Sequence, residues 1–325
     1  MRKSISIIIP TFQRSERLIK ILTSLQEQID DWNFFEILIC DSFSPDDSEK
    51  NITNFVSKYN LKKIRYLNIK KNNLSAKRNC GIENSSHKHL ILIDDDCIPR
   101  KNFINFFLED FNRIDESTIL SGVVEYSPEM INLSNYLNFR NSRHFSKKQV
   151  KEDNLIESKH FVAMNMGFVK SSKILDLGLF NENFVGYGFE DFEFAYRVKK
   201  KGFKLKQTKA SILHDEGIPS FEGYLKKHFH LGRDGMTNFL KIDKTAAKET
   251  IYFKIENNIF VYFFMKIPFV KLFLKQMEKL LIKIDTSKLF YCSMIYNVAR
   301  LSSYLRGSVS RNKITTNTAN GNWYD

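Results

Sequence analysis

Hydrophobic and polar positions follow a repeating order along the first hundred residues. Short runs of apolar, mostly β-branched residues are each followed by a polar loop and then by apolar residues three or four positions apart. The apolar runs, which predict buried strands, are 4–9, 34–40, 64–69 and 89–93. The segments between them predict helices that begin at Arg14, near residue 46 and at Ser75, the last with Ser75 as its N-cap. This strand–loop–helix order predicts an α/β protein with an open, mostly parallel sheet covered by helices on both faces.

The pattern changes after residue 100. A helix near 101–113 and a strand near 118–126 are followed by an irregular polar region that extends to about residue 160. Residues 220–325 have a helical pattern and many lysines, and they end in a polar segment at 315–325 that predicts a frayed tail. The sequence therefore predicts an α/β domain over 1–219 and a basic helical region over 220–325.

Composition limits the kind of protein but does not assign a function. The chain has 325 residues, 42% of them hydrophobic, which is enough for a substantial core. Its formal net charge of +13 favours a polyanionic partner such as nucleic acid, an anionic membrane or a phosphorylated substrate, with plain solubility as an equal alternative. The four cysteines are scattered and suggest neither a disulfide framework nor a zinc ribbon. The apolar run before Pro10 is too short for a signal peptide, so the expected location is the cytoplasm.

Three consecutive aspartates, Asp94, Asp95 and Asp96, directly follow the predicted strand at 89–93. Like charges this close repel, so the triplet is either a solvated acidic turn or a site for a positively charged partner. Mg²⁺ and Mn²⁺ prefer oxygen ligands and commonly reach proteins through one or two carboxylates plus substrate phosphates. We expect Asp94 and Asp96 to point to one side and Asp95 to the other, which makes Asp94 and Asp96 candidate metal ligands.

Two further features add candidate chemistry. His214 ends another short apolar run, and imidazole suits Mn²⁺ as a third ligand, although a lone histidine is more often an ordinary polar residue. Glu190 and Asp191 open a predicted helix after two glycines. Acidic residues favour the positive end of the helix dipole, which explains them structurally, but a carboxylate kept ionised there also suits a general base.

These motifs together resemble the inverting glycosyltransferases of family two, which have the GT-A fold. The resemblance covers roughly residues 4–217 and rests on six segments in the family's order: SIIIPTFQR (6–14), ILICDSFS (37–44), NNLSAKRNCG (72–81), ILIDDDCIP (91–99), LGLFNENFVGYGFEDFEFAYRVKKKG (177–202) and ILHDEG (212–217). It implies a Rossmann-like GT-A catalytic domain over 1–219 and an enzyme that takes its sugar from a nucleotide-sugar donor.

The resemblance also implies which residues bind the nucleotide. The implied positions are Pro10, Thr11, Arg14, Asp41, Arg78, Asp94 and Asp95. Among them, Asp41 matches the carboxylate that contacts the base, usually uracil, and Arg78 lies in the helix that approaches the diphosphate in relatives.

The metal site and the base follow from the same resemblance. In the D-x-D motif the second aspartate, Asp96, would bind the metal, and Asp94 would hold the nucleotide or ribose and join the metal site. His214 is similar to the histidine that completes the metal site in some members. Asp191 matches the carboxylate proposed as the catalytic base, with Glu190 beside it as an acceptor contact.

The expected reaction is metal-dependent, inverting transfer of a hexosyl or N-acetylhexosaminyl group to a hydroxyl of a glycan or lipid-linked acceptor. The expected metal is Mn²⁺ or Mg²⁺, the expected donor is a UDP-sugar, and the expected product is a polysaccharide or another glycan. The family's processive synthases carry a Q-x-x-R-W motif and several membrane spans, and the sequence shows neither, so a single addition is expected.

Two other functions remain as alternatives. The enzymatic one is a sugar nucleotidyltransferase of similar fold, which would need a glycine-rich loop after the first strand, where PTFQR (10–14) has no glycine. The alternative from another class is a non-catalytic nucleotide- or glycan-binding relative. A nucleic-acid-binding module is not favoured, because the aromatic residues fall mostly at apparent core positions.

The segment 259–284 is apolar and aromatic, but lysines interrupt it at 266, 271 and 275. It is therefore a poor candidate for a membrane span and a better one for a helix that lies in the interface of an anionic membrane. Such a helix would place the protein peripherally at the inner face of the plasma membrane. A helix packed on the catalytic domain and a homodimer contact are the alternatives.

Overall fold

The computed structural model describes residues 3–143, 152–217, 220–285, 287–288 and 291–311. The predicted tail at 315–325 lies outside this part. The chain forms two compact units, which interleave along the sequence. The sheet unit comprises Met1–Ser127, His144–Glu182 and Glu190–Glu216, and the helical unit comprises Pro128–Arg143, Asn183–Phe189 and Gly217–Asp325. The domain boundary at residue 219 stays a prediction, but two short segments that precede it belong to the helical unit.

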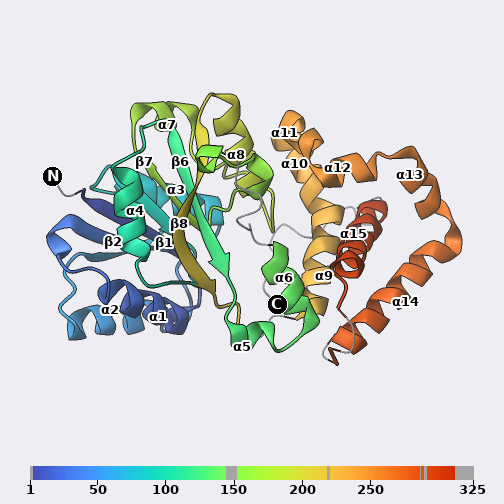
Figure 1. The fold of residues 1–325 in the computed structure, drawn as a ribbon, viewed down its shortest axis with the longest axis horizontal. Coiled ribbons are helices and arrows are strands. Elements are labelled where there is room, and N and C mark those ends of the chain that lie inside the picture. The colour runs from blue at the N-terminus through green and yellow to red at the C-terminus, as the bar shows by residue number, and fades with distance from the viewer. Residues whose placement is uncertain (1–2, 144–151, 218–219, 286, 289–290, 312–325) are drawn as a thin grey trace. The chain divides into compact units, whose positions relative to one another are not determined.

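An eight-stranded sheet, in the order β3-β2-β1-β4-β7-β6-β8-β5, forms the frame of the sheet unit (Figure 1). The strands are β1 Ile5–Thr11, β2 Phe35–Asp41, β3 Ile64–Asn68, β4 His89–Ile93, β5 Cys97–Pro99, β6 Thr118–Glu125, β7 Asn165–Val169 and β8 Lys204–His214. The first four pair in parallel, β7 is antiparallel to β4 and β6, and β8 is parallel to β6 and antiparallel to β5. The predicted α/β class with a flanked sheet is confirmed.

Helices cover both faces of this sheet, which is why β1 and β2 are buried at every position. Successive side chains of a strand point to opposite faces. Ile7 and Ile9 pack in one core with α1 (Ser15–Gln26), α2 (Ser48–Lys58) and α4 (Phe103–Phe111). Ile8 packs in the other core with α3 (Leu74–Asn84), α7 (Ser172–Leu177) and α8 (Glu190–Lys200).

Helix α3 lies close to the sheet because of one glycine, and an asparagine caps its N-terminus. A Cβ added at Gly81 would lie 2.3 Å from Cγ2 of Ile8, so only glycine fits there without a shift. Asn73 caps the helix, since its side chain accepts from the N–H of Ala76. The predicted N-cap, Ser75, is wrong: it lies buried inside the first turn, because Leu74 already belongs to the helix.

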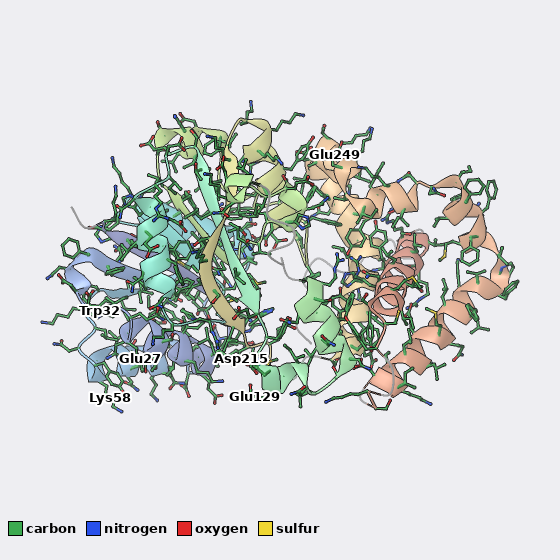
Figure 2. All side chains as sticks on the ribbon, in the orientation of Figure 1. Glu27, Trp32, Lys58, Glu129, Asp215 and Glu249 are labelled. Atoms are coloured by element: carbon green, nitrogen blue, oxygen red, sulfur yellow. The ribbon has the colours of Figure 1, made fainter. Side chains whose placement is uncertain are left out.

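The parallel strands bring their carboxyl ends to the same edge of the sheet. Thr11 ends β1, Asp41 ends β2, and the aspartate triplet follows β4. The end of β8 reaches the same place. Asp215, which is labelled in Figure 2, directly follows β8, and its N–H donates to the carbonyl of Asp96 at 2.7 Å. This edge therefore gathers polar residues from distant parts of the sequence.

The helical unit consists of helices joined by short connections. They are α5 Pro128–Ile131, α6 Asn135–Arg143, α9 Phe221–His230, α10 Met236–Ile242, α11 Lys244–Glu249, α12 Ile251–Glu256, α13 Ile259–Lys266, α14 Pro268–Asp285 and α15 Ser293–Val309. A Cβ at Gly307 would lie 2.0 Å from the carbonyl oxygen of Phe229, so the end of α9 and α15 approach each other closely. Within the described part of the chain, none of the helices combines the length and the apolar character needed to cross a membrane.

Candidate functional site

The aspartate triplet occupies a turn between β4 and β5. The N–H of Cys97 donates to the carbonyl of Asp94 at 3.0 Å and closes this turn. The three side chains have different partners: Asp95 and Asp96 share Arg14, and Asp94 pairs with Arg78. The expectation that Asp94 and Asp96 point to one side stays a prediction.

Asp95 and Asp96 share Arg14 from the loop after β1. Nη1 of Arg14 lies 2.7 Å from Oδ1 of Asp95 and 3.1 Å from Oδ2 of Asp96. The other oxygen of Asp95 accepts from Oγ1 of Thr11 at 2.9 Å and from the N–H of Phe12 at 3.4 Å. Burial raises the pKa of Asp95 to about 6, although Arg14 acts in the opposite direction. The structure thus brings together Thr11, Arg14 and Asp95, and Asp95 holds the loop after β1.

Asp94 faces Arg78, which is 1% exposed and extends from α3. Nη2 of Arg78 donates to both oxygens of Asp94, at 3.0 and 3.2 Å, and Nη1 donates to Oδ1 of Asp191 at 2.8 Å. Burial disfavours the charge of Arg78, but Asp94 and Asp191 outweigh it and raise the pKa of the guanidinium. Arg78 is therefore a fixed cation between two carboxylates of the site.

Asp191 and Glu190 lie in the first turn of α8. The second oxygen of Asp191 accepts from the N–H of Ala163 at 3.1 Å, so both oxygens of this carboxylate are held. Burial, followed by the charge of Asp191, raises the pKa of Glu190 to about 7. The two adjacent carboxyl groups therefore differ: Asp191 is oriented by a cation, and Glu190 exchanges its proton near neutral pH.

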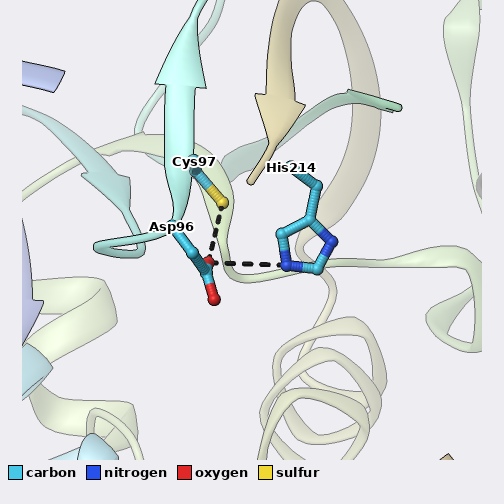
Figure 3. Close-up of side chains that lie close together, drawn as sticks. All are labelled: Asp96, Cys97 and His214. Carbon is cyan, nitrogen blue, oxygen red and sulfur yellow. Dashed lines mark hydrogen bonds and ion pairs between the residues drawn. The ribbon is translucent and has the colours of Figure 1, made fainter. Parts of the chain in front are cut away.

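His214 lies opposite the triplet at the end of β8. Its Nε2 is 3.5 Å from Oδ1 of Asp96 (Figure 3), and its Nδ1 is 3.1 Å from Oε1 of Glu216 and 3.2 Å from the hydroxyl of Tyr126. Burial alone would raise the pKa of Asp96, but its hydrogen bond to His214 and the charge of that ring outweigh burial and lower it. The imidazole is held on one side by a carboxylate and presents the other side to Asp96.

This arrangement fits a divalent cation. Three possible ligand atoms lie within 4.8 Å of one another: a carboxylate oxygen of Asp96, the thiol sulfur of Cys97 and a ring nitrogen of His214. A metal-binding histidine commonly donates its second N–H to a carboxylate, which is the position of Glu216. Burial raises the pKa of the Cys97 thiol well above its usual range, so the thiolate that soft metals prefer is disfavoured. The residues present therefore fit a divalent cation at Asp96 and His214, while Asp94 is held by Arg78.

Asp41 and Pro10 complete the predicted nucleotide-binding positions. Asp41 is 1% exposed, and its two oxygens accept from the N–H and the hydroxyl of Ser44, at 2.8 and 2.7 Å. It therefore shapes the loop after β2. Pro10 is buried within β1 and pairs with Cys40 in the register of the two strands.

Lys77 is a site residue that sequence reasoning did not select. Its side chain is buried, lies 5.0 Å from the centre of the Phe12 ring and donates to Oδ1 of Asn72 at 3.0 Å. Burial lowers the pKa of this ammonium to about 8, and the charges of Asp95 and Asp41 act against that shift. The sequence feature that could have indicated Lys77 is its place directly before Arg78. Lysine and arginine are rarely buried without an anionic partner, and the structure buries both.

The chain also resembles known proteins in sequence. Residues 6–173, slightly more than half of the 325, match the model described as glycosyl transferase family 2. The chain belongs to this family. The known proteins that it resembles include two chondroitin synthases: one from Escherichia coli, 22% identical over 248 residues, and one from Pasteurella multocida, 29% identical over 249 residues. These alignments cover 67% of this chain but only 35% and 25% of the two synthases, so the chain spans about a third or less of their length.

Solved structures show the same fold. The mannosyltransferase PcManGT from Pyrobaculum calidifontis, described in complex with GDP-Man and Mn²⁺, superposes with a TM-score of 0.59 at 14% identity and covers 96% of this chain and 88% of its own. This likeness confirms the predicted GT-A fold. The predicted family and the predicted fold are thus established, whereas the roles of single residues stay predictions.

Proposed function

We propose that this family 2 chain is a metal-dependent, inverting glycosyltransferase that moves a hexosyl or N-acetylhexosaminyl group from a nucleotide-sugar to an acceptor hydroxyl. The observation that carries the proposal is the meeting of three groups at one edge of the sheet. A carboxylate–imidazole pair (Asp96 and His214) lies beside a buried cation (Arg78) that orients a second carboxylate (Asp191). Stabilisation of the leaving group needs positive charge, which a cation held by Asp96 and His214 would supply. Removal of the acceptor's proton needs a carboxylate such as Asp191.

The donor would bind through the loops that follow the strands. Pro10 and Thr11 end β1, Arg14 lies in the loop that follows, and Asp95 binds both Thr11 and Arg14, while Asp41 holds the loop after β2. These two loops flank the position that a base and ribose occupy in sheets of this kind. We propose a UDP-sugar as the donor. The complex of the P. calidifontis mannosyltransferase with GDP-Man makes a guanine nucleotide the first competitor to test.

Charge on the leaving group is the main demand of the reaction. The bond between the anomeric carbon and the diphosphate oxygen breaks, and its electron pair stays on the diphosphate. Asp96 and His214, together with Asp94, would hold Mn²⁺ or Mg²⁺. When bound, this metal supplies positive charge to the diphosphate. Arg14, in the loop after β1, and Lys77, in α3, are proposed to add positive charge without proton transfer.

The acceptor hydroxyl must lose its proton as it attacks. Asp191 is proposed as the base, since Arg78 and the Ala163 N–H fix its orientation. Glu190, beside it, is proposed to contact the acceptor. One direct displacement at the anomeric carbon inverts its configuration, and we propose a single addition per binding event.

Nucleotide binding tests this proposal directly. Calorimetric titration of the full chain with UDP, GDP and CDP, each with Mn²⁺ and with EDTA, should show Mn²⁺-dependent binding of UDP. Absence of binding by all three nucleotides would contradict the transferase as proposed. The Asp191→Asn variant is the matched control, because it should bind UDP like the wild type and fail in turnover.

We also propose that an anionic membrane surface is a partner, contacted through α13 and α14 at the inner face of the plasma membrane. Large apolar side chains of these helices are strongly exposed: Phe260 80%, Phe269 69%, Phe263 61%, Phe273 61% and Leu272 60%. The buried side chains of the two helices, Met265, Val270 and Leu274, form a small core that packs against Leu305 of α15.

Charge on the same helices favours lipid over a neutral partner. Lys266, Lys271, Lys275, Lys279 and Lys283 are exposed, and no described carboxylate pairs with them. The acidic residue among them, Glu278, is buried and binds Arg306 of α15. An exposed face of phenylalanine and lysine is typical of helices that lie in the interface of anionic bilayers.

A further inference from the structure

A buried arginine without a carboxylate lies in the helical unit. Arg300, on α15, is 9% exposed, and its Nε is buried without a hydrogen-bond partner in the described structure. Its other nitrogens donate to the hydroxyl of Tyr252 and, at 3.4 Å, to Oδ1 of Asn297. Both acceptors are neutral groups. Burying an arginine is unfavourable unless its charge is compensated, so a bound anion would stabilise this side chain.

The surroundings of Arg300 are positive or neutral. His228 places its Nε2 3.1 Å from the same Tyr252 hydroxyl, and burial lowers the pKa of this imidazole to about 3, so it is uncharged. Arg140, from α6, lies over the ring of Tyr224 at 5.2 Å, and that ring is 4.3 Å from the ring of His228. Two arginines from two helices therefore converge on one cluster of neutral aromatic side chains.

Carboxylates near the same helix are used elsewhere. Glu256 pairs with Arg311 and accepts from the hydroxyl of Tyr304. Glu278 accepts from Arg306 at 3.1 Å. Asp285 accepts from the hydroxyl of Tyr296 at 2.7 Å. The chain thus compensates the neighbouring Arg306 and Arg311 and leaves Arg300 without a carboxylate among the described residues.

We propose that Arg300 is the buried anchor of an anion-binding site in the helical unit, and that the site takes the phosphate group of a phosphate ester. The guanidinium offers several donors in a planar fork that matches phosphate oxygens, and Nε is the donor that the protein leaves open. Arg140 and the exposed Arg143, at the end of α6, lie close enough to act electrostatically on Tyr224, as Arg300 does, and would attract an anion from solvent. This site is separate from the proposed chemistry and does not depend on it.

The test measures binding of inorganic phosphate and of glucose 1-phosphate by calorimetry, in EDTA and at constant ionic strength. Arg300→Met removes the charge and keeps an apolar stem of similar length. Arg306→Met, on the same helix, removes an arginine whose charge Glu278 compensates. We expect Arg300→Met to weaken phosphate binding at least tenfold and Arg306→Met to leave it within about twofold of the wild type.

Two further measurements separate the outcomes. Short-chain phosphatidic acid below its micelle concentration tests a lipid head group: binding of this lipid alone, lost in Arg300→Met, would assign the phosphate to a lipid. Circular dichroism shows that each variant is folded, and Arg300→Lys, which keeps the charge, should retain part of the binding. Phosphate binding that is equal in the wild type and Arg300→Met, or absent from both with all three probes, would overturn the proposal.

Discussion

Arg78 donates to Asp191 across 2.8 Å, although 113 residues separate them in the sequence. The same guanidinium also binds Asp94, so one buried cation joins the turn after β4 to the first turn of α8. The two parts of the proposed chemistry, leaving-group binding and proton removal, therefore share a structural support. This relationship makes Arg78 a residue that positions other groups, in addition to any contact it has with the donor.

Replacement of Arg78 should destabilise the protein even without a ligand. Arg78→Met leaves Asp94 and Asp191 without their buried counter-charge, and breaking a buried pair from one side costs about 3–5 kcal/mol. Urea unfolding monitored by circular dichroism measures the loss. Arg17, whose charge lies on α1, is the control site: Arg17→Met should change the free energy of unfolding by less than about 0.5 kcal/mol. An Arg78→Met protein as stable as the wild type would show that Arg78 acts only on a ligand.

Replacement of the two carboxyl groups of α8 should separate their roles. Asp191→Asn keeps the size of the side chain and removes its basicity, so we expect turnover to fall by about 10²–10⁴-fold, the usual contribution of a general base. Its donor affinity should stay within a few fold of the wild type. Glu190→Gln should mainly raise the KM for the acceptor. Steady-state kinetics with donor and acceptor varied separately distinguishes the two, and loss of turnover in Glu190→Gln alone would reverse the assignment.

Much of the fold was predictable because the first strands are buried on both faces. Such strands are continuous apolar runs, and the predicted runs at 4–9, 34–40, 64–69 and 89–93 correspond to β1 to β4. The strands β5 and β7 were not predicted: β5 is only three residues long, and an asparagine and a glycine interrupt the apolar run of β7 (NMGFV). The long strand β8 has buried residues mainly at alternate positions among lysines, and only its last residues have the apolar pattern of a strand.

The location of the candidate site was predictable, but the directions of its side chains were not. Parallel strands place their ends at one edge, which brought Thr11, Asp41 and the triplet together on topological grounds. Asp94 pairs with Arg78, whereas Asp96 lies beside Arg14 and His214, and a pattern of strand alternation cannot show these partners. The pairing of Arg78 with Asp191 depends on tertiary packing between α3 and α8, for which a single sequence holds no signal.

The raised pKa of Glu190 predicts a pH dependence of stability. The folded protein holds this proton up to a pKa of about 7, whereas the unfolded chain releases it near 4.5. The folded state therefore binds more protons in this window, so the wild type loses stability as pH rises from 4.5 to 7. Glu190→Gln cannot ionise and avoids this loss. Relative to the wild type, the free energy of unfolding of the variant should increase by about 1–2 kcal/mol between pH 4.5 and pH 8. The full effect of the pKa shift would be larger, but the Glu190 side chain is partly exposed.

Urea midpoints of both proteins at the two pH values measure this gain. Glu193→Gln, in the same helix turn, is not a neutral control because Glu193 is paired with Arg197 at 2.6 Å. Glu109→Gln, on α4, is a better one, and its difference from the wild type should not change with pH. A constant difference between Glu190→Gln and the wild type would contradict the raised pKa.

The proposed metal site predicts a graded series of variants. Asp96→Asn should abolish Mn²⁺-dependent UDP binding, because it removes the carboxylate that faces His214. Glu216→Gln should weaken Mn²⁺ binding by about 10–100-fold, the usual effect of removing a carboxylate that orients a histidine ligand. Asp215→Asn is the matched control, since Asp215 is adjacent in sequence but binds Lys20. Electron paramagnetic resonance of Mn²⁺ titrations measures free metal directly, and equal affinities across the series would place the metal elsewhere.

The exposed face of α13 and α14 predicts binding to anionic vesicles. The chain should sediment with vesicles that contain phosphatidylglycerol and remain free with pure phosphatidylcholine. Changing Lys271, Lys275 and Lys279 together to glutamine should weaken this partition roughly a hundredfold, since each basic residue near such a surface contributes about 1 kcal/mol. Phe263→Ser with Phe269→Ser should weaken it further, because apolar burial supplies the other part of the binding energy.

Lys199, Lys200 and Lys201, at the end of α8, provide the matched control for charge. They are also exposed, but none of the exposed large apolar side chains of the described residues lies between Tyr187 and Ile251 in the sequence, so changing all three to glutamine should leave vesicle binding nearly unchanged. Analytical ultracentrifugation of the same variants without lipid tests the competing homodimer. A wild-type dimer that the Phe263→Ser and Phe269→Ser changes convert to monomer, together with no vesicle binding, would assign this face to a second copy of the chain and not to lipid.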